Sequence, residues 1–296
     1  MDVSKIMKDA VDMHVHCNPD CSMFMDRVRT NDDVIDQCHD AGMLGYVLKT
    51  HSWPQPTLAQ KLNEKYDDFH VIPSASLNLT AGGLHPWVIE MCHHMGVKVL
   101  WLPTWSGVNE YQNPGGWTYG CCTDLMPRLK AIPKSEYQVL LDENGELTDE
   151  VKECLVMIKD YDMVTGTGHI TEEEALKVAA FCKEIGYKKL CWTHPLAALN
   201  QVTDDMLRTF VDLGGYIELT LINILPIFTS TTLQKFADVI KMCGPDRCYI
   251  ATDHCYDWNP PIPVSFNMAI QGLNSIGIPI EDVAQVVRNP RELLGI

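Results

Sequence analysis

The sequence predicts an α/β fold, a (β/α)8 TIM barrel with an insertion after its fourth strand. Short apolar runs of strand character alternate with amphipathic helical segments along the 296 residues, and eight such pairs can be counted. Most of the runs are continuously apolar instead of alternating polar with apolar residues. That pattern is typical of parallel strands that are buried on both faces.

The expected strands are residues 10–14, 45–49, 70–75, 97–102, 163–168, 189–193, 216–220 and 248–252. The expected helices are residues 31–41, 57–66, 84–94, 148–161, 172–185, 204–213, 231–242 and 264–276. Thr171 followed by Glu172-Glu173-Glu174 is a typical helix start, because acidic side chains are favoured at the positive end of the helix dipole. Gly42 and Gly186 follow expected helices, where glycine commonly ends them.

A doubly wound open sheet is the alternative architecture. It normally carries a glycine-rich phosphate-binding turn after its first strand. Here that turn reads His14-Val15-His16-Cys17-Asn18-Pro19, without glycine. The barrel is therefore favoured.

One interval between expected strands is unusually long. Residues 106–147 form an insertion after the fourth strand, which in a barrel lies over the active-site face. We expect it to act as a lid, with a plain surface elaboration as the alternative. Asn144-Gly145 between apolar flanks predicts a hairpin at residues 137–147. No repeat or linker interrupts the chain, so residues 1–296 are expected to form a single domain.

The composition excludes some classes of partner. With 39 acidic and 23 basic residues the formal net charge is −16, which disfavours nucleic acid and anionic membrane surfaces. No apolar run of 18 residues predicts a membrane span, and no signal peptide is recognisable, so we expect a cytoplasmic protein. Twelve cysteines are present without paired Cys-x2-Cys knuckles. We expect most of them to be small buried hydrophobic residues.

Histidines and one aspartate stand where apolar strands end. His14 and His16 close the first strand and share a face, because strand side chains alternate. His169, His194 and Asp253 end the fifth, sixth and eighth strands. The carboxyl ends of barrel strands meet at one rim, so these side chains predict a site for a divalent cation, with zinc favoured over manganese or iron.

This arrangement resembles the amidohydrolase superfamily of metal-dependent hydrolases over essentially the whole chain. Members carry His-x-His on strand 1, a lysine or glutamate on strand 4, histidines on strands 5 and 6, and an aspartate on strand 8. The segment Asn289-Pro290-Arg291-Glu292-Leu293-Leu294-Gly295 is similar to the closing helix of many members, including the decarboxylase-containing branch. Gly215-Tyr216-Ile217-Glu218 is somewhat similar to the phosphotriesterase-type branch.

The chain departs from the family at strand 4. Lys98 stands at the start of that strand, and no acidic residue stands at its end; Glu110, nearby in the insertion, is expected to be a surface carboxylate. Lys49 closes strand 2 instead. We expect it to point into the site, where it could neutralise an oxyanion or be carbamylated as a substitute metal bridge. A salt-bridged or solvated lysine is the alternative.

The resemblance implies roles for the candidate residues. One ion is favoured, held by His14, His16, His169 and Asp253 or a subset of them. The alternative is a site for two ions, with His194, Lys49 and His51 as the ligands of the second ion. Asp253 would accept the proton of the attacking water, and His194 would otherwise polarise the bond under attack.

The implied activity is hydrolysis of an amide or cyclic amide C–N bond, or of an ester, in a small molecule. Candidate substrate contacts are His51, Trp105, Glu218 and Arg29. A buried structural carboxylate is the alternative for Glu218, and a solvent-exposed side chain is the alternative for Arg29. The alternatives are a non-oxidative decarboxylase or lactonase, and a barrel that binds a metal or ligand without catalysis. Self-association into a homo-oligomer is common in this superfamily and is left open here.

Overall fold

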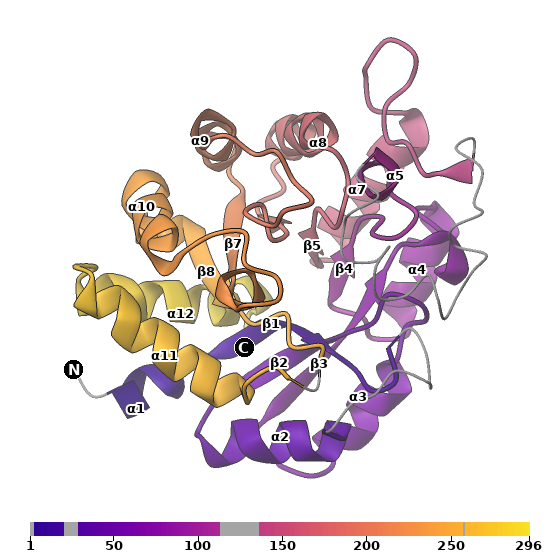
Figure 1. Cartoon of the computed structure of the whole chain (residues 1–296). Coiled ribbons are helices and arrows are strands. Elements are labelled where there is room, and N and C mark those ends of the chain that lie inside the picture. Colours follow the sequence, from indigo (N-terminus) through magenta and orange to yellow (C-terminus); the bar gives the residue numbers. More distant parts are fainter. Residues whose placement is uncertain (1–2, 21–28, 113–135, 257) are drawn as a thin grey trace.

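The computed structural model describes residues 3–20, 29–112, 136–256 and 258–296. Eight parallel strands follow one another in chain order within one sheet, each hydrogen-bonded to the next (Figure 1). The first and last strands meet through a parallel bridge between Val15 and His254, and the backbone N–H of His16 donates to the carbonyl of His254 at 2.9 Å. The predicted (β/α)8 barrel is confirmed.

The strands are β1 Val11–His16, β2 Gly45–Lys49, β3 His70–Ser76, β4 Val99–Trp101, β5 Val164–Gly166, β6 Leu190–Trp192, β7 Tyr216–Thr220 and β8 Cys248–Ala251. The bounds predicted for β2 and β7 agree with the structure in full. Strands β4, β5 and β6 are each three residues long and shorter than predicted. The apolar runs continue beyond the ladders, so the pattern of burial overestimates these strands.

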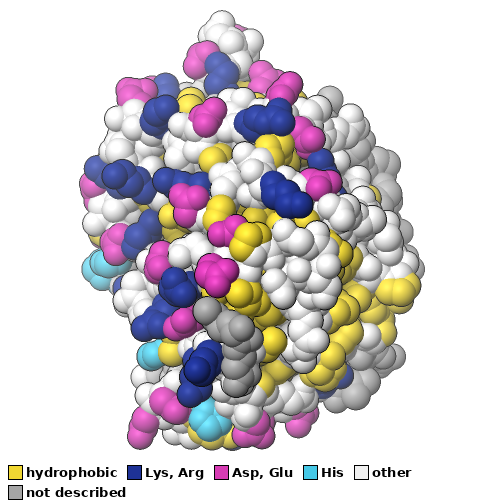
Figure 2. Space-filling view, turned by 90° about the vertical axis from the view of Figure 1, so that its left-hand side faces the viewer, with side chains coloured by type: hydrophobic (Ala, Val, Ile, Leu, Met, Phe, Trp, Pro, Cys, Tyr) yellow, Lys and Arg dark blue, Asp and Glu magenta, His cyan; other side chains and the backbone are white. Residues whose placement is uncertain are grey.

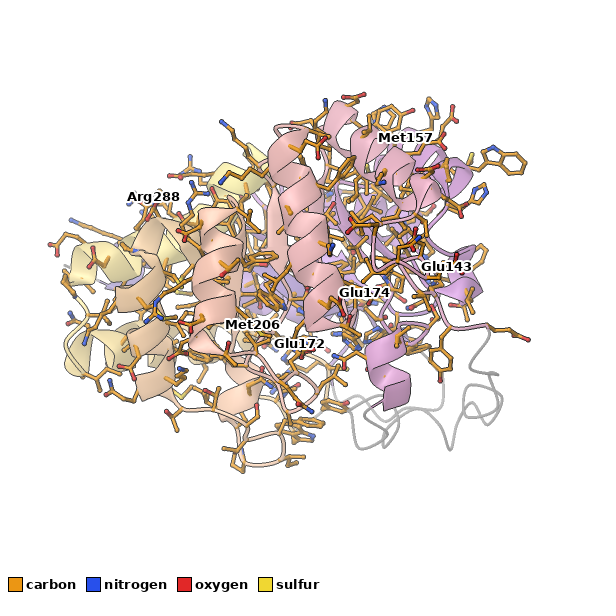
Figure 3. All side chains as sticks on the ribbon, turned by 90° about the horizontal axis from the view of Figure 1, so that it is seen from above. Glu143, Met157, Glu172, Glu174, Met206 and Arg288 are labelled. Atoms are coloured by element: carbon orange, nitrogen blue, oxygen red, sulfur yellow. The ribbon has the colours of Figure 1, made fainter. Side chains whose placement is uncertain are left out.

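Helices surround the sheet (Figure 1). They are α1 Val3–Met7, α2 Asn31–Asp40, α3 Pro56–Asn63, α4 Pro86–His94, α5 Val108–Gln112, α7 Asp149–Asp160, α8 Glu172–Glu184, α9 Asp204–Asp212, α10 Leu233–Cys243, α11 Ile262–Ser275 and α12 Ile280–Leu294. A capping box starts α8, since Thr171 accepts from the backbone N–H of Glu174 and the Glu174 carboxylate accepts in return. Figure 3 shows Glu172 and Glu174 at this end of α8.

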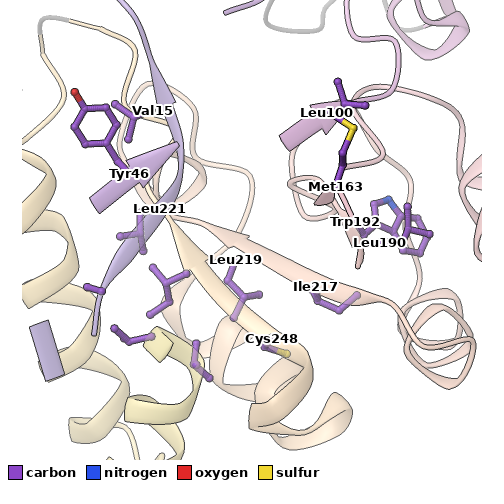
Figure 4. Close-up of a cluster of buried hydrophobic side chains, with 14 of the residues drawn as sticks. Val15, Tyr46, Leu100, Met163, Leu190, Trp192, Ile217, Leu219, Leu221 and Cys248 are labelled. Atoms are coloured by element: carbon purple, nitrogen blue, oxygen red, sulfur yellow. The ribbon is translucent and has the colours of Figure 1, made fainter. Parts of the chain in front are cut away.

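Two apolar layers hold the barrel together. Outward-facing strand residues such as Tyr46, Leu100 and Ile217 pack against the helices (Figure 4). Their neighbours Val47 and Val99 belong to a separate cluster that fills the inside of the barrel. This alternation along each strand is the reason that the runs read as continuously apolar.

Strand β1 breaks the alternation where the histidines begin. Val11 and Met13 belong to the inner cluster, whereas Val15 packs in the outer layer, so His14 and His16 on either side of it face inward. The pairing of β1 with β2 shifts register between Asp12 and Val15. A bulge of this kind redirects side chains near active sites. The bulge thus allows β1 to contribute Val11 and Met13 to the apolar interior of the barrel and to point His14 and His16 inward at its carboxyl end.

The end of the chain is explained by packing. Asn289, buried within α12, donates from Nδ2 to the carbonyls of Pro245 and Cys248, both at 2.7 Å. It therefore ties α12 to the start of β8. Gly295 ends the helix in a left-handed conformation with φ of 72°. The terminal segment has a structural role.

Part of the insertion lies within the described residues. Leu141 and Leu147 form an antiparallel bridge, and the N–H of Asp142 donates to the carbonyl of Glu146 at 2.8 Å. The hairpin predicted from Asn144-Gly145 is therefore present. The lid prediction for residues 106–147 falls largely on residues 113–135, which lie outside the described residues.

The surface carries both signs of charge. Figure 2 shows acidic and basic side chains interspersed on the side of α10, α11 and α12, with apolar side chains between them. Exposed apolar residues on α11 include Val264 and Met268. None of the described helices is long and apolar enough to cross a membrane. Most of the described cysteines are buried, as expected from the sequence, and Cys38, Cys92, Cys154, Cys182, Cys191, Cys243 and Cys248 are free thiols.

Gly168 and Gly186 both adopt a left-handed backbone conformation, but only Gly168 is tightly packed, so alanine substitutions at the two positions can be compared. Gly168, just before His169, has φ of 61°, and a Cβ there would lie 2.1 Å from the carbonyl oxygen of Leu102. Gly186 has φ of 75° with open space around it. We expect Gly186→Ala to lower the free energy of unfolding by about 1–2 kcal/mol from backbone strain. Gly168→Ala adds overpacking, and we expect a loss of about 3 kcal/mol or more.

Urea denaturation of both variants measures the difference. Equal losses for the two alanines would show that the backbone around Leu102 yields to a methyl group, contrary to the packing described above.

Candidate metal centre

The predicted ligands gather at the carboxyl ends of the strands. His14, His16 and Asp253 are buried, and one ligand atom of each lies within 4.8 Å of the others. The first two come from β1, and Asp253 lies two positions beyond the end of β8. The closure of the barrel between β1 and β8 is thus what brings residues 237 positions apart into contact.

His14 contacts three other strands. Its Nδ1 lies 2.8 Å from Oε1 of Glu218 on β7. On the other side of the ring, Lys49 on β2 donates from Nζ to Nε2 at 2.7 Å, and Oδ1 of Asp253 lies 3.1 Å from the same nitrogen. With the Nδ1 proton donated to Glu218, the Nε2 lone pair points into the site.

His16 is flanked by two carboxylates. Its Nδ1 lies 2.6 Å from Oδ2 of Asp20, and its Nε2 lies 2.8 Å from Oδ1 of Asp253. A neutral imidazole has one N–H and can donate to only one of them. The second contact requires a further positive centre, either a second proton or a metal ion. The donor set of two imidazoles and a carboxylate fits a divalent cation.

His169 and His194 form a neighbouring pair. Their Nε2 atoms lie 3.1 Å apart, and Nδ1 of His169 is hydrogen-bonded to Oε1 of Glu110. With that proton donated to Glu110, the Nε2 lone pair of His169 faces His194. His169 was expected to bind an ion together with His14 and His16, whereas its Nε2 lies against His194 in the structure. Two converging imidazoles again fit a cation.

Three carboxylates behind the histidines were not recognised as such in the sequence. Glu110 on α5 was expected at the surface, and this expectation is wrong, because its side chain is buried against His169. Asp20 and Glu218 complete the set. Metal-binding histidines usually donate their second N–H to a carboxylate or carbonyl, and a search for such partners is the signal that could have found these residues.

Two site residues adopt strained backbones. His194 has φ of 29° and Asp253 has φ of 54°. Residues other than glycine rarely adopt a positive φ, and the backbone strain of this conformation is found most often at functional sites. Because each residue lies two positions beyond the last residue of a strand, the turn sets the direction of its side chain.

Burial dominates the electrostatics of the site. It lowers the pKa of the Lys49 ammonium and lowers those of His14 and His194 well below the usual value. Burial also raises the pKa of Glu218 to about 8. Burial also acts to raise the pKa of Asp253. The neighbouring His14, His16 and Lys49 outweigh this effect and hold the pKa of Asp253 below its usual range. Asp253 is therefore an ionised carboxylate.

Two of the predicted substrate contacts, His51 and Trp105, pack together beside the site, whereas Arg29 and Glu218 are hydrogen-bonded to other parts of the protein. His51 is half-buried beside the site, hydrogen-bonded through Nδ1 to Thr104 at 2.9 Å, and its ring stacks on Trp105 with 4.8 Å between centroids. Arg29 donates from Nη1 to the carbonyl of Asn259 at 2.8 Å. Glu218 is hydrogen-bonded to the His14 ring and to the backbone N–H of His194, so it holds these two histidines in position. Lys98, outside the site as expected, is exposed.

Solved structures share this fold at low sequence identity. An amidohydrolase from Pseudomonas aeruginosa matches with a TM-score of 0.65 and 13% identity, covering 100% of both chains. The probable dipeptidase PvdM from Pseudomonas aeruginosa matches with 0.65 and 11%, over 99% of this chain and 97% of that one. An organophosphorus hydrolase from Deinococcus radiodurans matches with 0.60 and 13%, over 97% and 92%. The fold is the one that the resemblance predicted.

The sequence itself matches one family. No curated protein matches the chain. A family model, described as a family of unknown function (DUF6282), matches residues 9–218, which is most of the chain. The chain therefore belongs to the family of unknown function DUF6282.

Proposed function

We propose that the protein is a metal-dependent hydrolase that cleaves an amide or cyclic amide C–N bond of a small molecule. Cleavage of an ester bond is the alternative. One observation carries the proposal. Three buried histidines, His14, His16 and His169, are each backed by a carboxylate, and their other ring nitrogens meet Lys49, Asp253 and His194. This is the arrangement that orients imidazoles toward a metal.

The cation site comprises His14, His16 and Asp253, with His169 and His194 available for a second ion. Zinc suits the mixed nitrogen and oxygen donors, and manganese or iron suits them less well. When bound, such an ion lowers the pKa of water toward about 7 and polarises a carbonyl. A cytoplasmic location and a small-molecule partner belong to the same proposal.

Asp253 provides the proton transfer. Its Oδ1 faces the two β1 histidines, and its buried Oδ2 has no hydrogen-bond partner among the described residues. As water oxygen adds to the carbonyl carbon, Asp253 takes the water proton. It then delivers this proton to the leaving nitrogen as the C–N bond breaks.

Lys49 supplies positive charge to the same site. Its side chain is 1% exposed, and its ammonium lies 5.1 Å from the Trp101 ring centroid as well as against His14. In a desolvated site this charge stabilises the oxyanion that develops on the carbonyl oxygen. Carbamylation, the other role considered for Lys49, would replace the charge with a bridging carboxylate.

The names amidohydrolase and dipeptidase of two structures with this fold support an amide bond as the target. A non-oxidative decarboxylase or lactonase is the alternative function, and the terminal segment that resembles the decarboxylase-containing branch is tied to the start of β8 through Asn289. Analysis of products separates the activities, since decarboxylation releases carbon dioxide and hydrolysis does not.

Removing the β1 histidines tests the metal. We expect the double variant His14→Ala/His16→Ala to lose its bound metal, because both imidazole donors disappear. Elemental analysis of purified protein measures the content. His94→Ala, which changes an exposed histidine of α4, is the control and should keep the metal. An unchanged metal content in the double variant would falsify the assignment.

Removing a backing carboxylate tests the orientation of the ligands. We expect Glu110→Gln or Asp20→Asn to weaken metal affinity about 10- to 100-fold without removing a ligand. Competition with a chelator measures the affinity. Glu150→Gln, at the exposed Glu150–His85 pair, provides the control for the same change. Wild-type affinity in both site variants would mean that these carboxylates do not support metal ligands.

Asp253→Asn tests the proton transfer. An amide cannot accept the water proton, so we expect kcat/KM to fall about 10²- to 10⁴-fold. Hydrolysis of a panel of dipeptides, cyclic amides and lactones by metal-loaded protein provides the measurement. Asp246→Asn, an exposed position, is the control. Full activity of Asp253→Asn, or a wild-type protein inert toward the whole panel, contradicts the proposal; a merely metal-binding barrel predicts the second result.

A further inference from the structure

We propose that Thr220 and Asn223 bind the substrate, and that this substrate presents an N–H beside a C=O. The inference rests on the proposed hydrolase function and names the chemical class of its substrate. Neither residue was singled out by the sequence, and both lie outside the cluster of histidines and carboxylates described above.

Thr220 is placed by the alternation of β7. Glu218 faces inward and bonds to His14, and Thr220, two residues on, shares its face one layer nearer the carboxyl end. The Thr220 hydroxyl is buried and has no hydrogen-bond partner in the described part of the chain. Thr220 therefore lies one layer above Glu218, and its hydroxyl has no hydrogen-bond partner among the described residues.

Asn223 lies in the short 3-10 helix Leu221–Ile224 that follows β7. The N–H of Ile222 donates to the carbonyl of Thr252 at 3.2 Å, next to Asp253. The carbonyl of Asn223 accepts from the N–H of Ser230, whose hydroxyl donates to the carbonyl of Leu196, near His194. The turn is thus held between the ends of β6 and β8, which carry two of the site residues.

The Asn223 side chain is anomalous in the folded protein. It is 1% exposed, and neither its Nδ2 nor its Oδ1 has a hydrogen-bond partner among the described residues. Buried polar groups are bonded in the great majority of cases, and an unpaired amide destabilises the fold. Asp253 Oδ2 and the indole N–H of Trp105 are also buried and unpartnered within the described residues. These atoms occur on residues after β4, β7 and β8, at one end of the barrel.

The two atoms of the amide define complementary chemistry. Nδ2 donates and needs a carbonyl oxygen, whereas Oδ1 accepts and needs an N–H. A lactam or cyclic imide offers both groups on one edge, because the ring holds the amide in the cis form, whereas an open-chain trans amide points its N–H and C=O in opposite directions. An ester, a lactone or a carboxylate offers only acceptors and would leave Oδ1 unpaired. Asn223 thus favours amide over ester substrates, a choice that the metal site does not make.

Binding of two imides tests this inference. Succinimide and N-methylsuccinimide have the same ring and carbonyls, and only the first has an N–H. We expect metal-loaded wild-type protein to bind succinimide about 10- to 100-fold more tightly than N-methylsuccinimide. The reason is that N-methylsuccinimide has no N–H and leaves the buried Oδ1 of Asn223 without a donor. Ligand-observed NMR titration measures both affinities, and Asn223→Leu should remove the preference while the metal content stays unchanged.

Asn267→Leu makes the same change at an exposed position of α11 and should keep the preference. A preference that persists in Asn223→Leu would reflect the bulk of the methyl group and overturn the inference. So would a wild-type protein that shows no preference or binds neither imide.

A stability comparison needs no ligand. Asn223→Leu is similar in shape and removes an unpaired amide, so we expect an unchanged or higher Tm. Asn289→Leu removes an equally buried amide that makes two hydrogen bonds, and its Tm should fall. A matching fall for Asn223→Leu would show a structural role and overturn the inference. The proposed function fails separately, through lost metal binding or absent turnover.

Discussion

The paired burial of charge inside the barrel is the constraint on which the site depends. His14 meets Glu218 from β7, Lys49 from β2 and Asp253 from β8, and all four side chains are almost fully buried. A buried charge is costly unless a partner compensates it, so each of these residues is tolerable only because the others are present. Closure of the barrel is what supplies those partners from strands far apart in the chain.

The carboxylates behind the histidines also order the loops. Helix α5, Val108–Gln112, has five residues and is too short to be stable alone, but Glu110 anchors it to His169. Asp20 accepts from His16 and also from the backbone N–H of His51 at 2.6 Å, which joins the loop after β1 to the loop after β2. The groups that would orient metal ligands are thus the same groups that fix the rim of the barrel.

Much of the fold could be predicted because its signals are local. Apolar runs of about five residues, separated by capped amphipathic helices, predicted eight strands, and the bounds of β2 and β7 were right in full. The pattern overestimated β4, since buried apolar residues such as Leu102 continue past Trp101, the last residue of the strand. The short helix α5 went unrecognised, because it depends on one tertiary contact instead of its own periodicity.

The sequence by itself determined the fold class and the strand ends at which His14, His16 and Asp253 would stand, since strand period and position follow from neighbouring residues. Only the tertiary structure decided their partners. Glu110 lies 59 residues from His169 and is chemically identical to a solvated glutamate until the barrel closes around it. His169 faces His194 because the left-handed backbone at the strand ends, at Gly168 and at His194, redirects both side chains. No periodicity encodes that turn.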